Sequence, residues 1–245
     1  ESSSNYDFQI LKWFNQLNKK EFSEFIFPNE KLEDMLTYGE NAHQKAAFYQ
    51  DENKKKNWGN FRKLQGKPLS FNNHLDLDAS LNLLNNFREY KDNIVGVIKH
   101  TNPCGVSNGK NQLEAFNNAI ICDPISAFGG ILISNRKVDL ETAEEINKLF
   151  YEVLIAPDFS DDAFSLLKTK AKRVLLKQKN ITLPKTQYRT ILNGVLYQEK
   201  DLISDDSSLM KTVTKKQPSN RETDDLIFAS KVCKHTKSNT IVFAK

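Results

Sequence analysis

"IVGVIKHTNPCGVSNG", residues 94–109, joins a short apolar run to a lysine, a histidine and a segment that contains proline, cysteine and glycine. The apolar half is typical of a buried β-strand. Lys99 and His100 follow at the point where such a strand would end, and a buried strand accommodates neither side chain. The pair therefore calls for a chemical explanation, which the surrounding elements have to supply.

Helical and strand-like segments alternate on both sides of this stretch. Strands are predicted at four short apolar runs: 93–98, 130–134, 152–156 and 173–177. A helix is predicted before each of them: 76–90, 112–121, a segment capped by Asp139, and a segment after Asp161 and Asp162. Alternation of this kind predicts crossover units and a mostly parallel sheet covered on both faces. The expected fold class is therefore α/β.

The N-terminal part of the chain shows a different pattern. Apolar residues with a largely helical spacing predict an amphipathic helix over 5–27, which Pro28 helps to end. A loop is then expected to lead to a strand at "AAFY", residues 46–49. The charged, turn-rich stretch 51–60 is expected to be a solvated loop.

The alternation also stops near residue 180. Strands without an intervening helix are predicted up to residue 201, followed by a helix at 222–233 and a strand at 240–244. A second subdomain is therefore expected from about residue 190. Because a terminal strand needs neighbours and the chain begins without methionine, we expect a fragment or a processed piece of a longer protein.

Composition limits the classes of function. The chain has 35 Lys plus Arg against 31 Asp plus Glu, without a dominant basic block, so it makes no case for nucleic-acid binding. No apolar run approaches the ~20 residues that span a bilayer, and no signal peptide is recognised. Three scattered cysteines, Cys104, Cys122 and Cys233, provide no disulfide framework and fit a reducing compartment. We expect a cytoplasmic protein without a membrane segment.

Two interpretations of Lys99 and His100 stay open from the residues alone. Adjacent strand residues point to opposite faces, so both side chains serve one site only if the strand gives way to irregular backbone, which Thr101 and Pro103 favour. Ligands bind at the carboxyl ends of strands in open α/β sheets, and a histidine there is a candidate general base. The alternative is a solvated strand end whose histidine makes a local hydrogen bond.

Other chemistries find less support. Cys104 could be a nucleophile activated by His100, but small buried cysteines are commoner than catalytic ones. The zinc deaminase pattern fails because Pro103-Cys104 is not followed by a second cysteine three residues on. Neither a Walker loop nor GxGxxG is present, and Gly129-Gly130 alone is a weak signal. "KHTNP" at 99–103 is partly repeated as "KHTKSN" at 234–239, which makes His235 a second candidate histidine.

Eight motifs together are more specific than any one of them. They are TYGENAHQKAAFY (37–49), LSFNNHLDLDA (69–79), IKHTNPCGV (98–106), DPISAFGG (123–130), NRKVDLETAEEI (135–146), EVLIAPDF (152–159), NGVLYQEKD (193–201) and KSNTIVFAK (237–245). In order and spacing they resemble the AICAR transformylase domain of the bifunctional purine-biosynthesis enzyme that also carries IMP cyclohydrolase. The resemblance covers nearly the whole chain.

The resemblance implies a reaction and a fold. The reaction transfers the formyl group of 10-formyltetrahydrofolate, a folate co-substrate, to the 5-amino group of AICAR without a catalytic metal. The fold is a pair of cytidine-deaminase-like three-layer α/β/α subdomains, the first over 1–190 with the N-terminal helix and the second beginning at 191–245. A homodimer with active sites at its interface is implied as well.

The resemblance also assigns residues. It makes His100 the proton acceptor and Lys99 the group that stabilises developing charge. Nucleotide contacts are implied for five residues: Thr37, Tyr38, Gly129, Glu152 and Asn239. His235 becomes a structural residue, because the second motif of the family requires the asparagine.

Two departures from the family pattern keep an alternative open. Thr37 stands where the family usually has an arginine, so a charged, forked donor is missing. The family also has further substrate-contacting segments after "TIVFAK" and a cyclohydrolase domain before residue 1. We therefore expect the 245-residue chain alone not to turn over, and the alternative to a formyltransferase fragment is a nucleotide-binding remnant.

Overall fold

The computed structural model describes residues 2–18, 30–51, 61–179 and 183–245. The chain divides into two compact units, Glu1–Gly59 and Asn60–Lys245. This division does not test the predicted subdomain limits, 1–190 and 191–245. No helix within the described ranges is long and apolar enough to cross a membrane.

The first unit contains a helix and a β-hairpin. Helix α1 (Ser2–Leu17) confirms the first part of the predicted helix, whereas 19–27 lie outside the described residues. Of the loop expected at 51–60, Asp51 belongs to a strand and 52–60 lie outside the described residues. Strand β2 (Ala46–Asp51) confirms the strand at "AAFY" and pairs antiparallel with β1 (Glu30–Leu36). Strand β1 was not predicted, because four of its seven residues are charged and it lacks an apolar run.

The second unit is built on a six-stranded sheet with the order β3-β8-β7-β6-β4-β5. Its strands are β3 (Phe61–Gln65), β4 (Asn93–Lys99), β5 (Asn102–Gly109), β6 (Ile131–Ser134), β7 (Val153–Ala156) and β8 (Val174–Gln178). Strands β6, β7 and β8 pair in parallel, and β5 runs in the same direction. Four of the six strands thus share one direction, while β3 and β4 run against it. The α/β class is confirmed.

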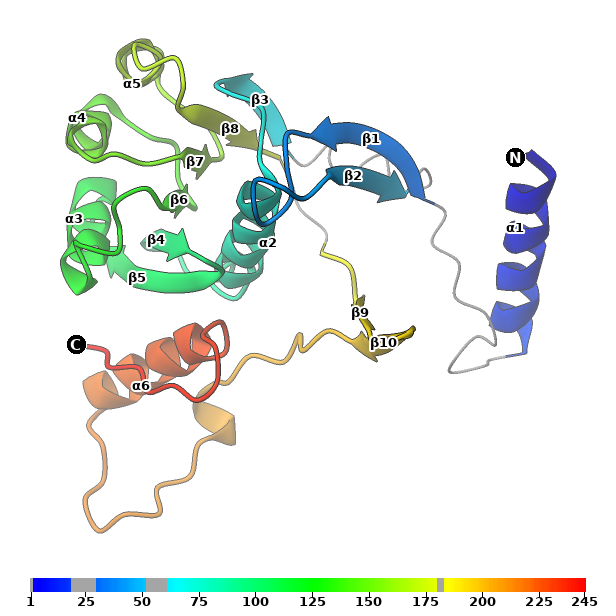
Figure 1. Cartoon of the computed structure of the whole chain (residues 1–245). Helices are drawn as coiled ribbons and strands as arrows, with labels where there is room; N and C mark the ends of the chain where they lie inside the picture. The colour runs from blue at the N-terminus through cyan, green and yellow to red at the C-terminus, as the bar shows by residue number, and fades with distance from the viewer. Residues whose placement is uncertain (1, 19–29, 52–60, 180–182) are drawn as a thin grey trace. The chain divides into compact units, whose positions relative to one another are not determined.

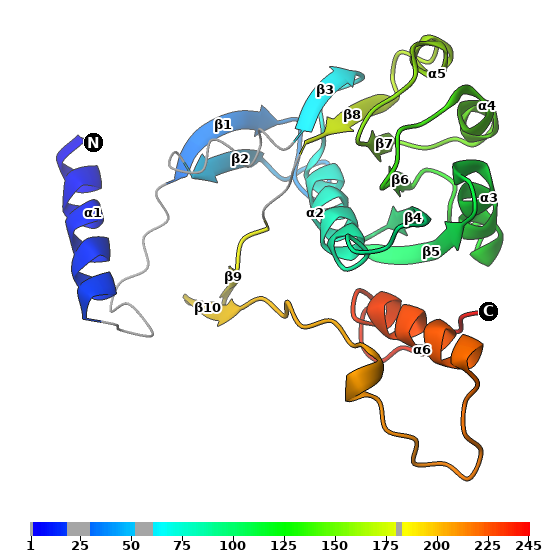
Figure 2. The ribbon, with the colours of Figure 1, turned by 180° about the vertical axis from the view of Figure 1, so that it is seen from behind.

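Helices cover both faces of this sheet (Figures 1 and 2). Helix α2 (Phe71–Asn85) lies on one face, and α3 (Gln112–Cys122), α4 (Leu140–Lys148) and α5 (Asp161–Leu167) lie on the other. Successive strand residues serve the two faces in turn. Val97 and Leu132 join the core cluster under α3 to α5, whereas Gly96 lies against Leu83 of α2. The result is a three-layer α/β/α arrangement.

Local capping explains where two of the helices begin. Asp139 caps α4 as predicted, with its side chain accepting a hydrogen bond from the backbone N–H of Thr142. Helix α2 begins at Phe71 rather than at residue 76, because Ser70 and Asn73 form a reciprocal capping box. The helix ends at Asn85, five residues before the predicted position. The early start places Asn73 and Asp76 in the first turns of α2.

Strand β5 forms where irregular backbone was expected after Lys99 and His100. Its sequence NPCGVSNG has the proline, glycine and polar residues of a turn. It forms a strand because it pairs with β4 along its length, from Asn93↔Gly109 to Lys99↔Asn102. Pairing with the preceding strand here outweighs local propensity.

The C-terminal part confirms most predicted elements. Strands β9 (Thr186–Ile191) and β10 (Gly194–Glu199) form an antiparallel hairpin, followed by a short 3₁₀ turn η3 (Ser207–Leu209) and helix α6 (Asn220–Cys233). The predicted strand at 240–244 was wrong, since this segment pairs with no strand among the described residues. Ile241 and Phe243 are exposed there.

Helix α6 packs beside the C-terminal end of α2. The ring of Phe228 lies 5.0 Å from the ring of Phe87, and Lys231 Nζ lies 4.8 Å above the ring of Tyr90. Just after the helix, His235 Nε2 is hydrogen-bonded to the side-chain amide of Asn86. Burial, together with the nearby charge of Lys234, lowers the pKa of His235 to about 4. The imidazole therefore stays neutral in the folded protein at physiological pH.

This buried histidine predicts a pH dependence of stability. Below about pH 6.5, His235 becomes protonated in the unfolded chain but stays neutral in the folded chain until the pH approaches about 4. The free energy of unfolding therefore falls as the pH falls. Between pH 7 and pH 5 this residue should account for a loss of about 2 kcal/mol. Urea unfolding of the wild type and of His235→Gln at both pH values measures it. An identical pH dependence in the two proteins would contradict the assignment.

Candidate active site

A strained hairpin turn presents the lysine–histidine pair. Strand β4 ends at Lys99 and β5 begins at Asn102, leaving a two-residue turn of His100 and Thr101. Both turn residues have positive φ, 53° and 61°. This is the left-handed geometry that two-residue hairpins usually give to asparagine and glycine. A histidine and a β-branched threonine there are unfavourable, and such strain clusters at functional sites.

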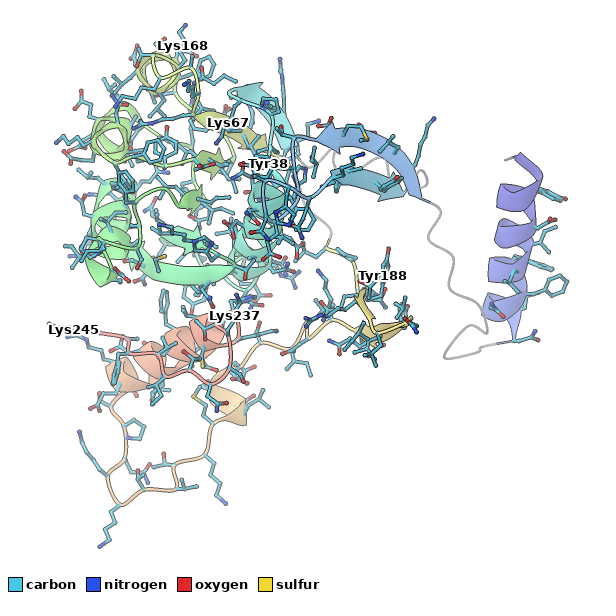
Figure 3. The ribbon with its side chains drawn as sticks, in the orientation of Figure 1. Tyr38, Lys67, Lys168, Tyr188, Lys237 and Lys245 are labelled. Atoms are coloured by element: carbon cyan, nitrogen blue, oxygen red, sulfur yellow. The ribbon has the colours of Figure 1, made fainter. Side chains whose placement is uncertain are left out.

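Several side chains hold this turn in place. Asp76 Oδ1 accepts a hydrogen bond from the backbone N–H of Thr101 at 2.7 Å. The carbonyl oxygen of His100 accepts from Thr101 Oγ1 at 2.6 Å and from Lys237 Nζ at 3.3 Å. The backbone N–H of Lys237 donates to Asn102 Oδ1 at 3.0 Å. The segment after α6 is thereby fixed against the turn (Figure 3).

Lys99 points to the start of the neighbouring strand. Its Nζ donates to the carbonyl oxygen of Phe128 at 2.7 Å, just before β6 begins. Gly129 follows with φ +76° and donates its N–H to the carbonyl of Phe150 at 2.8 Å. A Cβ on Gly130 would lie 2.9 Å from the carbonyl oxygen of Ile98. Gly130 therefore lets this loop approach the end of β4 closely, and Gly129 supplies the positive φ before it.

Glu152 lies at the same edge, directly before β7. Its N–H donates to the Gly130 carbonyl at 3.0 Å. Its Oε2 accepts from Lys67 Nζ at 2.8 Å and from Asn73 Nδ2 at 3.1 Å. Burial alone would raise the pKa of Glu152, but the hydrogen bonds from Lys67 and Asn73 and the charge of Lys67 outweigh it and lower the pKa. The carboxylate is therefore ionised at neutral pH.

The structure thus brings four predicted residues to one edge of the sheet: Lys99, His100, Gly129 and Glu152. The fifth, Asn239, follows two residues after Lys237, and its Oδ1 accepts from Ser238 Oγ at 3.4 Å. Thr37 and Tyr38 belong to the first unit, where both are exposed after β1. His235 lies away from the turn and is hydrogen-bonded to Asn86.

Among the contributing residues that were missed from the sequence are Lys67, Asn73, Asp76 and Lys237. The capping pair Ser70 and Asn73 was the available signal, because it would have placed the start of α2 at this edge. Lys67 and Asp76 reach the site only through tertiary contacts that no local pattern encodes.

The thiol alternative loses support in the structure. Cys104 lies on β5 and packs against the core. Burial, and after it the charge of Asp123, raises the pKa of the Cys104 thiol. The thiolate that a nucleophile requires is therefore disfavoured.

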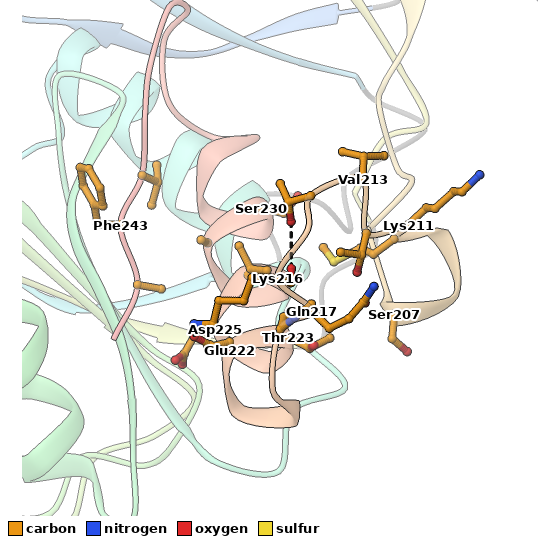
Figure 4. A pocket seen from close by; sticks show the side chains of 18 residues that line it. Ser207, Lys211, Val213, Lys216, Gln217, Glu222, Thr223, Asp225, Ser230 and Phe243 are labelled. Carbon is orange, nitrogen blue, oxygen red and sulfur yellow. Dashed lines mark hydrogen bonds and ion pairs between the residues drawn. The ribbon is translucent and has the colours of Figure 1, made fainter.

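A cavity of about 1110 Å³ lies elsewhere in the second unit (Figure 4). It is lined by residues of α6, of the segment 207–218 and of the segment 242–244. None of the predicted site residues lines it. Among the residues that the structure describes, no group of three or more His, Cys, Asp and Glu side chains could hold a metal ion.

Comparison with known proteins gives consistent matches. The sequence model of a family described as AICARFT/IMPCHase bienzyme matches residues 1–245. A protein named bifunctional purine biosynthesis protein PurH from Bacteroides thetaiotaomicron is 43% identical over 247 residues, covering 99% of this chain and 46% of the relative. The PurH protein of a Thermoanaerobacter species is 46% identical over 241 residues, covering 98% and 47%. The chain spans about half the length of the curated relatives it matches.

The ion pair at Glu152 predicts a measurable contribution to stability. Because the pKa of Glu152 is lowered on folding, its contribution is present above the unfolded pKa and is lost as the pH falls through the folded one. Both partners are partly exposed, so Glu152→Gln should lower the free energy of unfolding at pH 7 by only about 0.5–1 kcal/mol. Urea unfolding at pH 7 and pH 4 tests this.

The matched control is Glu145→Gln, which removes the more exposed pair with Lys148. We expect this change to have a smaller effect at pH 7. A Glu152→Gln effect that is no larger than the control, or that grows on acidification, would contradict the assigned ion pair.

Proposed function

The chain belongs to the AICARFT/IMPCHase bienzyme family, and on that premise we propose that it contributes to formyl transfer from 10-formyltetrahydrofolate to the 5-amino group of AICAR. We also propose the partners that the family implies, namely the nucleotide, the folate and a second copy of the chain in a cytoplasmic homodimer. The subdomain limits 1–190 and 191–245 remain part of this proposal.

The observation that supports the proposal most strongly is that Lys99, His100, Gly129 and Glu152 lie together at the end of β4. The amino group of AICAR is a poor nucleophile, because its lone pair is delocalised into the imidazole ring and the carboxamide. A base has to remove its proton as the new bond forms. His100 is exposed on the turn and is proposed as that base.

Lys99 is proposed to stabilise the negative charge that develops on the formyl oxygen. Its ammonium is held by the Phe128 carbonyl, so the charge is positioned before the reaction begins. Preorganised donors of this kind lower a barrier because they need no reorganisation during the reaction. Gly129, Glu152, Asn239, Thr37 and Tyr38 are proposed to contact the nucleotide.

One observation favours the alternative of nucleotide binding without turnover. Thr37 lacks the charge and the forked donor geometry of an arginine. Threonine keeps a hydroxyl that can donate one hydrogen bond. Calorimetric binding of AICAR without formyl transfer would favour this alternative.

The proposal predicts a large effect at His100. In the natural polypeptide that contains this chain, His100→Ala should lower the rate of formyl transfer by about two to four orders of magnitude, because the proton acceptor is removed. Release of tetrahydrofolate, followed by its absorbance, measures the rate.

The control is His235→Gln, which changes the buried histidine bonded to Asn86 and should leave the rate nearly unchanged. Circular dichroism establishes that both variants are folded. If His235→Gln were the more damaging change in a folded protein, the assignment of His100 as the base would be wrong.

A further inference from the structure

Asp76 lies in α2 and is half-buried beneath the strained turn. Its Oδ1 accepts a hydrogen bond from the backbone N–H of Thr101 at 2.7 Å. One side chain from a different element thus holds the turn at the residue that follows His100. No sequence pattern singled it out.

The turn requires such a partner. His100 and Thr101 both have positive φ, which non-glycine residues adopt only when the surroundings impose it. The bond from Thr101 Oγ1 to the His100 carbonyl lies within the turn, and that of Lys237 reaches the turn from the surface. Asp76 is the contact that ties the turn to a helix of the core.

The surroundings of Asp76 disfavour its ionised form. Burial raises its pKa, and the nearby carboxylate of Glu152 acts in the same direction, whereas the bond from Thr101 acts against it. Lys67 partly neutralises Glu152. Lys99 and Lys237 also bring positive charge to this edge. An acidic group kept at such a position is a candidate for a functional role.

We propose that Asp76 is a positioning residue for His100, whose carboxylate fixes the turn backbone and thereby the place at which the imidazole is presented. This inference rests on the proposed function. A small misplacement of a reacting group can cost about 100-fold in rate even when every reacting residue is present. The proposal includes no contact between Asp76 and the substrate.

The experiment compares Asp76→Ala, which removes the acceptor, with Asp76→Asn, which keeps an oxygen acceptor for the Thr101 N–H. In the natural polypeptide we expect Asp76→Ala to lower kcat by about tenfold or more with KM for AICAR changed less than twofold. Asp76→Asn should restore kcat to within about threefold. A residue that only stabilises the fold would not produce this split.

The matched control is Asp78→Ala, two residues along the same helix. The Asp78 side chain is 65% exposed and lies 3.9 Å from Lys200 Nζ, away from the turn. We expect its kcat to be unchanged. If Asp76→Ala does not fold, Asp76→Glu replaces it, because it keeps the charge but moves the oxygens by one methylene; it too should lower kcat.

Amide hydrogen exchange at Thr101 gives a readout without substrate. Exchange should accelerate in Asp76→Ala and stay slow in Asp76→Asn and Asp78→Ala. Unchanged kcat in Asp76→Ala or Asp76→Glu, equal losses in Asp76→Ala and Asp76→Asn, or unchanged Thr101 exchange would overturn the inference while leaving the function of His100 intact. Absence of formyl transfer in the folded wild type would instead overturn the proposed function, and the exchange result would still decide the Asp76 contact.

Discussion

The antiparallel pairing of β4 with β6 determines which residues share the candidate site. Val95 is opposite Ser134 and Ile98 is opposite Ile131, so the end of β4 lies beside the beginning of β6. Strand β7 runs parallel to β6 and begins at the same edge. Lys99 and His100 at the end of one strand therefore meet Gly129 and Glu152 before two others. Had β4 run parallel to β6, these groups would lie at opposite edges of the sheet.

The rigid sheet and the strained turn have complementary roles. Strands β4 and β6 to β8 are almost entirely buried between two layers of helices, which fixes the backbone on which the site stands. Among the described non-glycine residues of the site, His100 and Thr101 are those with positive φ. Contacts from α2, through Asp76, and from the segment after α6, through Lys237, support them. The site thus depends on elements far apart in the sequence.

The sequence predicted the central strands and helices because apolar runs of strand length alternate with capped helical segments, as at Asp139. It did not reveal β1 or β5, whose charged or turn-like residues form strands only through pairing with a neighbour. Missing β5 also concealed the reversal of β4, since an apolar run does not encode strand direction. The predicted strand at 240–244 failed because a strand requires a partner. Lys99 and His100 were singled out by their position at a strand end, and family resemblance then assigned their roles and those of Gly129 and Glu152. Asp76 and Lys67 depend on tertiary contacts.

Mapping the bound nucleotide on the sheet tests most directly whether the reversed β4 creates the site. Titration of AICAR into the isotope-labelled chain, followed by amide chemical shifts in NMR, distinguishes the two edges. The account predicts changes at Lys99, His100, Gly129 and Glu152. The opposite edge, at the carboxyl ends of β6 and β8 where open α/β sheets usually bind ligands, has a cavity of about 350 Å³ lined in part by Asn135 and Gln178. Changes confined to Asn135 and Gln178 would contradict the account.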